Sequence, residues 1–191
     1  MVRLFEQPSY LGVATAGWVA ALKSSDSLER RLAAHALAEI GRMAREAVPP
    51  LTEALRDSES FVRVWAAAAL ARVEPEHPAA IPALVAGTRE GISFVRSLAA
   101  WHLGRLGPRH PGIEAAVPEL RELLNDNDPS ARAEALVALG NLAGKGAPPA
   151  ELKSLSAHGV MPAAGIILAT SSLAAAADSV LELVEFLGDG V

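Results

Sequence analysis

The sequence predicts an all-α protein: a right-handed α-solenoid of about four to five helical hairpins stacked into a superhelix. The first reason is a recurring arginine, which opens a stretch of small apolar residues and is followed seven positions later by a leucine. The second is a recurring proline that follows Val or Ile. The arginines are Arg30, Arg63, Arg96 and Arg132, spaced by 33, 33 and 36 residues, and the prolines are Pro49, Pro82 and Pro118, spaced by 33 and 36. Such a period is typical of stacked helical units, each of which buries its apolar face only against its neighbours.

Each arginine lies near the start of an expected first helix of its unit. The apolar residues that follow step by three or four positions. They are Val62, Ala66, Leu70 and Val73 in one unit, and Val95, Ala99, Leu103 and Leu106 in the next. This spacing puts them on one helical face, which we expect to pack inside the stack. Each proline marks the first turn of an expected second helix, because a residue there needs no N–H for an intrahelical bond.

The repeats divide the chain into three parts. Residues 1–24 are expected to form a degenerate N-terminal cap with a helix near residues 17–23. Residues 25–145 hold the repeats, at about 25–57, 58–90, 91–126 and 127–157, the last unit including its second helix. Residues 158–191 are expected to form an apolar C-terminal capping helix pair. The nearly uncharged stretch 154–177 is long enough to span a bilayer, but its Pro, Gly and many Ala residues favour packed helices over a membrane span.

The turn before each first helix also carries a recurring acid. Asp57, Glu90 and Asp126 lie six residues before Arg63, Arg96 and Arg132 respectively. An acid near a helix N-terminus is favoured by the macrodipole, and an arginine at a fixed place in each unit is suited to a ladder of ion pairs and carbonyl contacts along the stack. The alternative is an anion-binding arginine stripe, which the recurring acid makes the weaker interpretation.

Composition narrows the classes of function. The net charge of −5 argues against a protein that grips nucleic acid, because such binding depends on clustered Lys and Arg. The chain has no cysteine, which removes disulfides and thiolate chemistry and fits a reducing compartment. The N-terminus does not match the pattern of a signal peptide. We therefore expect a cytoplasmic protein that binds no nucleic acid and has no membrane span.

No catalytic or metal-binding constellation is recognisable. The five histidines precede Ala, Pro, Leu, Pro and Gly, and the sequence brings no set of ligands together at metal-binding spacing. Trp65 and Trp101 occupy different positions of the repeat, so each is expected to pack against a neighbouring unit rather than to form an aromatic stripe. There is no glycine-rich phosphate loop between a strand and a helix. The sequence thus predicts a protein that is not an enzyme, with no metal, cofactor or catalytic residue.

The repeat resembles the HEAT family, particularly the short bacterial HEAT-like units that are also found in phycobilisome lyases. The matching elements are the acidic turn, the Val-Arg pair that precedes an alanine-rich first helix with its leucine, and the Val-Pro or Ile-Pro start of the second helix. The resemblance covers residues 25–142 and implies a fold rather than an activity, since one fold serves many unrelated functions.

The favoured function is a non-catalytic scaffold or accessory module that binds another protein. We expect the partner on a concave surface formed by the second helices, on the apolar C-terminal end, or on both. The candidate surface residues are Thr52, Glu53, Arg56, Val85, Ala86, Arg89, Arg121 and Glu122. Self-association through residues 165–187 is a further expectation. Two alternatives stay open: an enzyme or enzyme accessory similar to the lyases that attach bilins, implied by the resemblance alone, and a membrane-associated accessory subunit.

Overall fold

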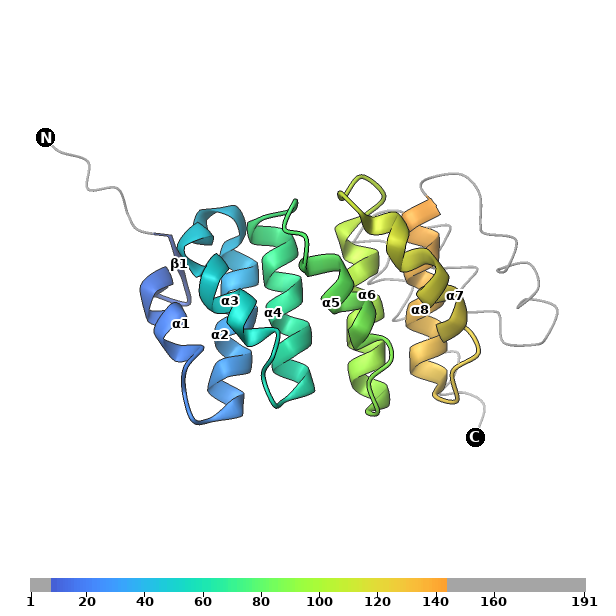
Figure 1. Ribbon diagram of the computed structural model, residues 1–191, viewed down its shortest axis with the longest axis horizontal. Coiled ribbons are helices and arrows are strands. Elements are labelled where there is room, and N and C mark those ends of the chain that lie inside the picture. Colours follow the sequence, from blue (N-terminus) through green and yellow to red (C-terminus); the bar gives the residue numbers. More distant parts are fainter. Residues whose placement is uncertain (1–7, 144–191) are drawn as a thin grey trace, which may run out of the picture.

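The computed structural model describes residues 8–143, which form a row of stacked helical hairpins (Figure 1). Long first helices alternate with short second helices. The first helices are α2 (Ser27–Ile40), α4 (Ser60–Val73), α6 (Ser93–Leu106) and α8 (Pro129–Ala143). The second helices are α1 (Thr15–Ala21), α3 (Val48–Ala54), α5 (Ala80–Gly87) and α7 (Val117–Leu123). Short 3-10 segments, Gly41–Ala47 and Ile113–Ala116, lead into α3 and α7. The prediction of an all-α solenoid is confirmed.

The second helices lie together on one side of the row of first helices (Figure 1). Pro49 and Pro118 lie in the first turns of α3 and α7, where a residue needs no N–H for an intrahelical hydrogen bond. Gly41 and Gly107 follow the last residues of α2 and α6 with φ of 64° and 77°, a backbone conformation that favours glycine. These residues stop the first helices and turn the chain towards the second-helix side.

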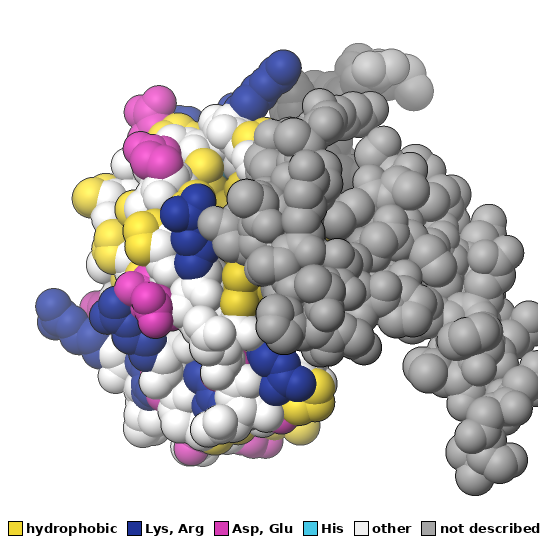
Figure 2. Space-filling model, turned by 90° about the vertical axis from the view of Figure 1, so that its right-hand side faces the viewer, with side chains coloured by type: hydrophobic (Ala, Val, Ile, Leu, Met, Phe, Trp, Pro, Cys, Tyr) yellow, Lys and Arg dark blue, Asp and Glu magenta, His cyan; other side chains and the backbone are white. Residues whose placement is uncertain are grey.

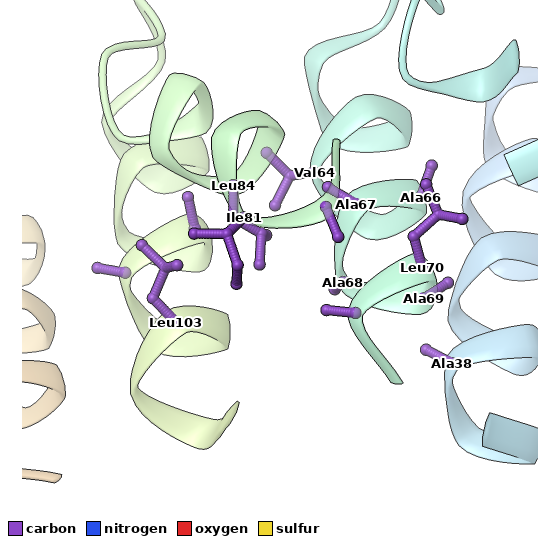
Figure 3. Packing of buried hydrophobic residues seen from close by; sticks show 14 of the residues in the cluster. Ala38, Val64, Ala66, Ala67, Ala68, Ala69, Leu70, Ile81, Leu84 and Leu103 are labelled. Carbon is purple, nitrogen blue, oxygen red and sulfur yellow. The ribbon is translucent and has the colours of Figure 1, made fainter. Parts of the chain in front are cut away.

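The core consists largely of alanine, with one buried leucine in each of the first helices α2, α4 and α6 and two in α8 (Figure 3). Leu37, Leu70 and Leu103, the leucines that recur every 33 residues, are fully buried. In α4 every residue from Ala66 to Leu70 is buried, because this helix is covered by α2, α3, α5 and α6. Small side chains allow neighbouring helices to approach closely, and the leucines fill the space that remains between units.

Two glycines mark the closest approaches between helices. A Cβ atom on Gly104 of α6 would lie 2.7 Å from the Cα atom of Ala138 in α8. A Cβ atom on Gly87 of α5 would lie 2.7 Å from Val64 Cγ2 in α4 and 2.9 Å from the Cβ atom of Ala99 in α6. The last turn of α5 thus wedges between α4 and α6. These two first helices pack less extensively on each other than α2 on α4 or α6 on α8.

A small β-hairpin precedes α1, and the sequence did not predict it. Strands Ser9–Tyr10 (β1) and Val13–Ala14 (β2) pair antiparallel around Leu11 and Gly12, which have φ of 51° and 78°. Positive φ at both central residues is the geometry of the tight turns that suit twisted strands. Trp18 of α1 donates from Nε1 to the carbonyl of Tyr10 at 3.3 Å, which ties the hairpin to the first helix.

Several expectations fall outside the described residues. They are the second helix of the fourth unit, the capping helix pair at 158–191 with its self-association segment 165–187, and the apolar stretch 154–177. Within residues 8–143, no helix has the length and apolar character needed to cross a bilayer.

Candidate functional site

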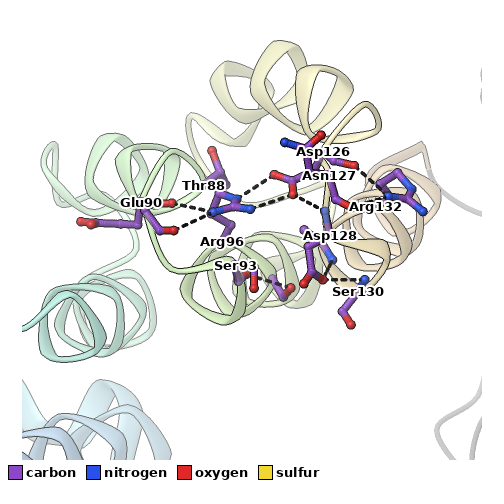
Figure 4. A network of polar contacts seen from close by, with 12 residues as sticks. Thr88, Glu90, Ser93, Arg96, Asp126, Asn127, Asp128, Ser130 and Arg132 are labelled. Carbon is purple, nitrogen blue, oxygen red and sulfur yellow. Dashed lines mark hydrogen bonds and ion pairs between the residues drawn. The ribbon is translucent and has the colours of Figure 1, made fainter.

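The recurring arginines and acids come together as an arginine ladder, defined by the pairs Arg30–Asp57, Arg63–Glu90 and Arg96–Asp126. Figure 4 shows the last of these pairs. Arg30 donates from Nε and Nη2 to the two carboxylate oxygens of Asp57 at 2.6 and 2.9 Å. Arg96 binds Asp126 in the same bidentate way, with both distances 2.7 Å. Each arginine therefore pairs with the acid of the following turn, not with the acid six residues before it.

The arginines bind their own preceding turns through backbone carbonyls instead. The Nη1 group of each arginine donates to the two carbonyls six and five residues earlier. These acceptors are Ser24 and Ser25 for Arg30, Asp57 and Ser58 for Arg63, Glu90 and Gly91 for Arg96, and Asp126 and Asn127 for Arg132. Asp57 thus accepts from Arg30 on its carboxylate and from Arg63 on its carbonyl. Each turn links two successive units.

The ion pairs shift the pKa values of their acids. The hydrogen bonds from Arg96 hold the pKa of Asp126 below its usual range, against the opposing effect of partial burial, and Arg30 does the same to the pKa of Asp57. A carboxyl whose pKa is lower in the folded than in the unfolded chain stabilises the fold above its unfolded pKa. That contribution disappears as the pH falls through the folded pKa.

We expect Asp126→Asn to lower Tm by about 3 °C at pH 7 and to make almost no difference at about pH 2. The variant loses the charge that Arg96 binds but keeps an oxygen to accept from the N–H of Asp128, which lies 2.8 Å from Oδ1. Thermal unfolding followed by circular dichroism at several pH values measures the difference. Glu76→Gln, an exposed site in the loop before α5, serves as the control. A Tm difference that persisted unchanged at low pH would show that the charge of Asp126 is not what stabilises the turn.

The predicted surface residues lie on α3, α5 and α7, or just after these helices. Six of them are exposed: Glu53, Arg56, Ala86, Arg89, Arg121 and Glu122. Val85 is half-buried and packs against the core. Thr52 is also half-buried; its hydroxyl donates to the carbonyl of Val48 at 2.8 Å and lies 3.3 Å from His77 Nε2.

Arg89 is the residue that joins two neighbouring second helices. Its guanidinium makes a bidentate ion pair with Glu119 of α7, with Nε 2.6 Å from one carboxylate oxygen. Glu119 raises the pKa of Arg89, chiefly through this hydrogen bond. The pair joins the turn after α5 to α7, so it braces the candidate surface between two units. The sequence comparison of units did not single out Glu119.

A row of aromatic and imidazole rings runs across the stack and was also missed. Trp65 of α4 makes edge-on contacts with His35 of α2 and His102 of α6, with ring centroids 4.7 and 4.5 Å apart. His102 contacts Trp101, and His35 contacts Tyr10 of the hairpin. Trp65 does pack against neighbouring units, as predicted. The row was not predicted because its members occupy different positions of the repeat, so a comparison of equivalent positions does not bring them together.

Figure 2 shows the described surface at the α8 end of the molecule, where basic, acidic and hydrophobic side chains are interspersed. Among residues 8–143, no group of three or more His, Asp or Glu side chains is placed to hold a metal ion.

Comparisons with known proteins agree with this architecture. The family model for HEAT repeats matches residues 15–104 and 93–174. The complex of CpcE and CpcF of phycocyanin lyase from Nostoc sp. PCC7120 has a similar structure, with a TM-score of 0.54 and 21% identity over 87% of this chain and 95% of that one. This similarity shows the fold alone.

An engineered protein of known structure is 27% identical over 86% of this chain and 75% of its own, with a TM-score of 0.48. No curated protein matches the chain significantly. The two family matches together span most of the sequence and include every described helix. The chain belongs to the HEAT repeat family.

Proposed function

We propose that the chain is a non-catalytic scaffold that binds a protein partner on the concave surface expected along α3, α5 and α7. The observation that carries this proposal is the repetition of exposed side chains at equivalent places of these helices. Glu53, Ala86 and Glu122 share one position, and Arg56 and Arg89 share another. The centre of the surface is small and apolar, and charges of both signs flank it, as in many protein interfaces.

The architecture supports this use. The arginine ladder links the turns of successive units, and Arg89–Glu119 links two second helices, so the surface is held in one shape before a partner arrives. A preorganised surface loses less conformational entropy on binding, which raises affinity for a given contact area. The proposal places the scaffold in the cytoplasm. Self-association through residues 165–187 is a separate proposal, and the similarity to a phycocyanin lyase complex does not by itself extend to bilin chemistry.

We expect the double variant Arg56→Glu and Ala86→Glu to reduce partner capture at least tenfold without changing helicity. Both side chains are exposed, so the changes introduce charge on the surface and leave the core intact. Full-length protein serves as bait in native lysate, and captured proteins are quantified by mass spectrometry. Val85 is left unchanged because it packs against the core, where a glutamate would test folding rather than binding.

The matched control is the double variant Leu32→Glu and Arg42→Glu, in α2 and in the 3-10 segment that follows it. Both control residues are exposed, and neither lies on a second helix. It should capture the same proteins as the unchanged chain. Equal capture by all three baits, or a loss confined to the control, would remove the second-helix surface from the proposed function.

A further inference from the structure

A cleft opens between the C-terminal halves of α4 and α6, away from the second-helix surface. Its volume is about 340 Å³, within the range of small-molecule sites. The walls are Ala68 and Arg72 from α4 and His102, Arg105 and Leu106 from α6, and His110 lies in the loop beyond α6. The cleft exists where these two helices pack less extensively than their neighbours do, with the last turn of α5 wedged between them on the other side.

The charged groups that line this cleft are basic. Arg72 and Arg105 both line it, and no carboxylate of residues 8–143 does. Arg72 donates from Nη1 to Glu39 at 2.8 Å, which leaves other N–H groups of the guanidinium for a ligand. Arg105 lies over the ring of Trp101 with its central carbon 4.5 Å from the centroid, so its position is fixed by a cation–π contact. Within residues 8–143, no carboxylate pairs with Arg105.

His102 adds a polar atom that lacks a partner. Its side chain lines the cleft and the residue is only 6% exposed, yet its buried Nε2 has no hydrogen bond among the described residues. Burial, together with the positive charges of Arg105 and Arg72, lowers the pKa of His102 to about 3. The imidazole is therefore neutral at physiological pH. The rings of Trp65 and Trp101 contact this imidazole, and Nε2 has almost no surface open to the cleft, so His102 gives the wall a neutral ring face.

The fold also limits how much negative charge the cleft would accept. It lies at the C-terminal ends of α4 and α6, where helix dipoles place partial negative charge, and Glu39 neutralises part of Arg72. Phosphate sites are typically built at the opposite, N-terminal ends of helices. A single negative charge fits this balance better than a dianion. The alanine and leucine side chains in the walls favour an apolar body on the same ligand.

We propose that this cleft binds a small organic monocarboxylate, with its carboxylate on the arginines and its apolar body against Leu106 and the imidazole ring of His102. Hydrogen bonds between a guanidinium and a carboxylate are among the stronger polar contacts in proteins. This site is independent of the proposed protein-binding surface, because none of its lining residues belongs to α3, α5 or α7.

The test uses mandelate, a monocarboxylate with a hydroxyl group and a phenyl ring, added to the full-length protein. Its binding is followed by the ¹⁵N resonances of the His102 side chain in nuclear magnetic resonance spectra. We expect a saturable shift with a Kd on the order of 1 mM, as for a ligand of this size. Mandelamide has the same shape without the charge and should bind at least tenfold more weakly. Inorganic phosphate should also bind at least tenfold more weakly than mandelate.

Two variants complete the test. Arg105→Gln should weaken mandelate binding about tenfold or more, because the exposed arginine can be replaced without disturbing the core. Arg109→Gln, an exposed arginine nearby that does not line the cleft, should bind as the unchanged chain does. The proposal is overturned if mandelate gives no saturable shift up to about 10 mM. It is equally overturned if mandelamide or phosphate binds as tightly, or if both variants behave alike.

Discussion

Leu70→Ala should lower the free energy of unfolding by about 3 kcal/mol, the cost of removing a buried leucine side chain and leaving a cavity. Leu70 is fully buried in α4, the helix with neighbours on the most sides, and it contributes to the core between units (Figure 3). The alanines around it have no flexible side chains with which to fill the space. Urea unfolding followed by far-ultraviolet circular dichroism measures the change.

The matched control for this change is Leu32→Ala in the adjacent first helix. Leu32 is 49% exposed, so the same substitution there should change the free energy of unfolding by about 0.5 kcal/mol or less. The contrast tests the assignment of the helical face, since both leucines lie in first helices of the same length. Equal losses of stability from the two substitutions would show that the face of α4 that carries Leu70 is not buried inside the stack.

Gly104→Val should destabilise the protein by at least about 3 kcal/mol, at the upper end of overpacking effects. A side chain at this site would meet the backbone of Ala138, and backbone cannot move aside as a flexible side chain does. Helices α6 and α8 would have to separate, exposing the alanine-rich contact between them. Ordinarily valine is a better helix residue than glycine, so helical propensity predicts the opposite sign.

The control is Gly91→Val, in the loop before α6. A Cβ atom there would meet nothing within 4 Å, and the residue does not have a positive φ. Thermal unfolding of both variants should therefore show a loss of about 10 °C or more for the helical site and little change for the loop site. If Gly104→Val were as stable as the parent chain, the close approach of α6 and α8 would be wrong.

Much of the fold could be predicted from the sequence, because the apolar residues that recur at the repeat period are buried in the stack. The 33-residue period of Leu37, Leu70 and Leu103 identifies three of the fully buried leucines, and Pro49 and Pro118 identify the starts of second helices. The β-hairpin before α1 escaped because its signal is two residues, Leu11 and Gly12, that adopt positive φ in a tight turn. A two-residue turn has no repeating pattern in the sequence from which it could be predicted.

The arrangement of the candidate sites was harder to predict from the sequence. Asp57 lies 27 residues after Arg30 and six residues before Arg63, and both spacings recur in the next unit, so periodicity alone does not say which pair shares a side-chain contact. The cleft beside His102 depends on how far apart α4 and α6 lie, which follows from the wedge of α5 at Gly87 rather than from the residues of the cleft. Distances between helices are properties of packing that a single-unit motif does not encode.

Each acidic turn binds one arginine through its carboxylate and the next through its carbonyl, and this affects which insertions and deletions the fold can accept. Asp57 receives one arginine on its carboxylate and the next on its carbonyl, and Asp126 does the same between Arg96 and Arg132. If recombination deleted or duplicated one complete unit, every new junction would again join an acidic turn to an arginine on each side. Within a unit, the spacing between an arginine and its acid grows from 27 residues in Arg63–Glu90 to 30 in Arg96–Asp126 without loss of the pair, so the connecting loop also accepts a short insertion. The chain is therefore built to tolerate gains and losses in whole repeats, the step by which tandem arrays evolve.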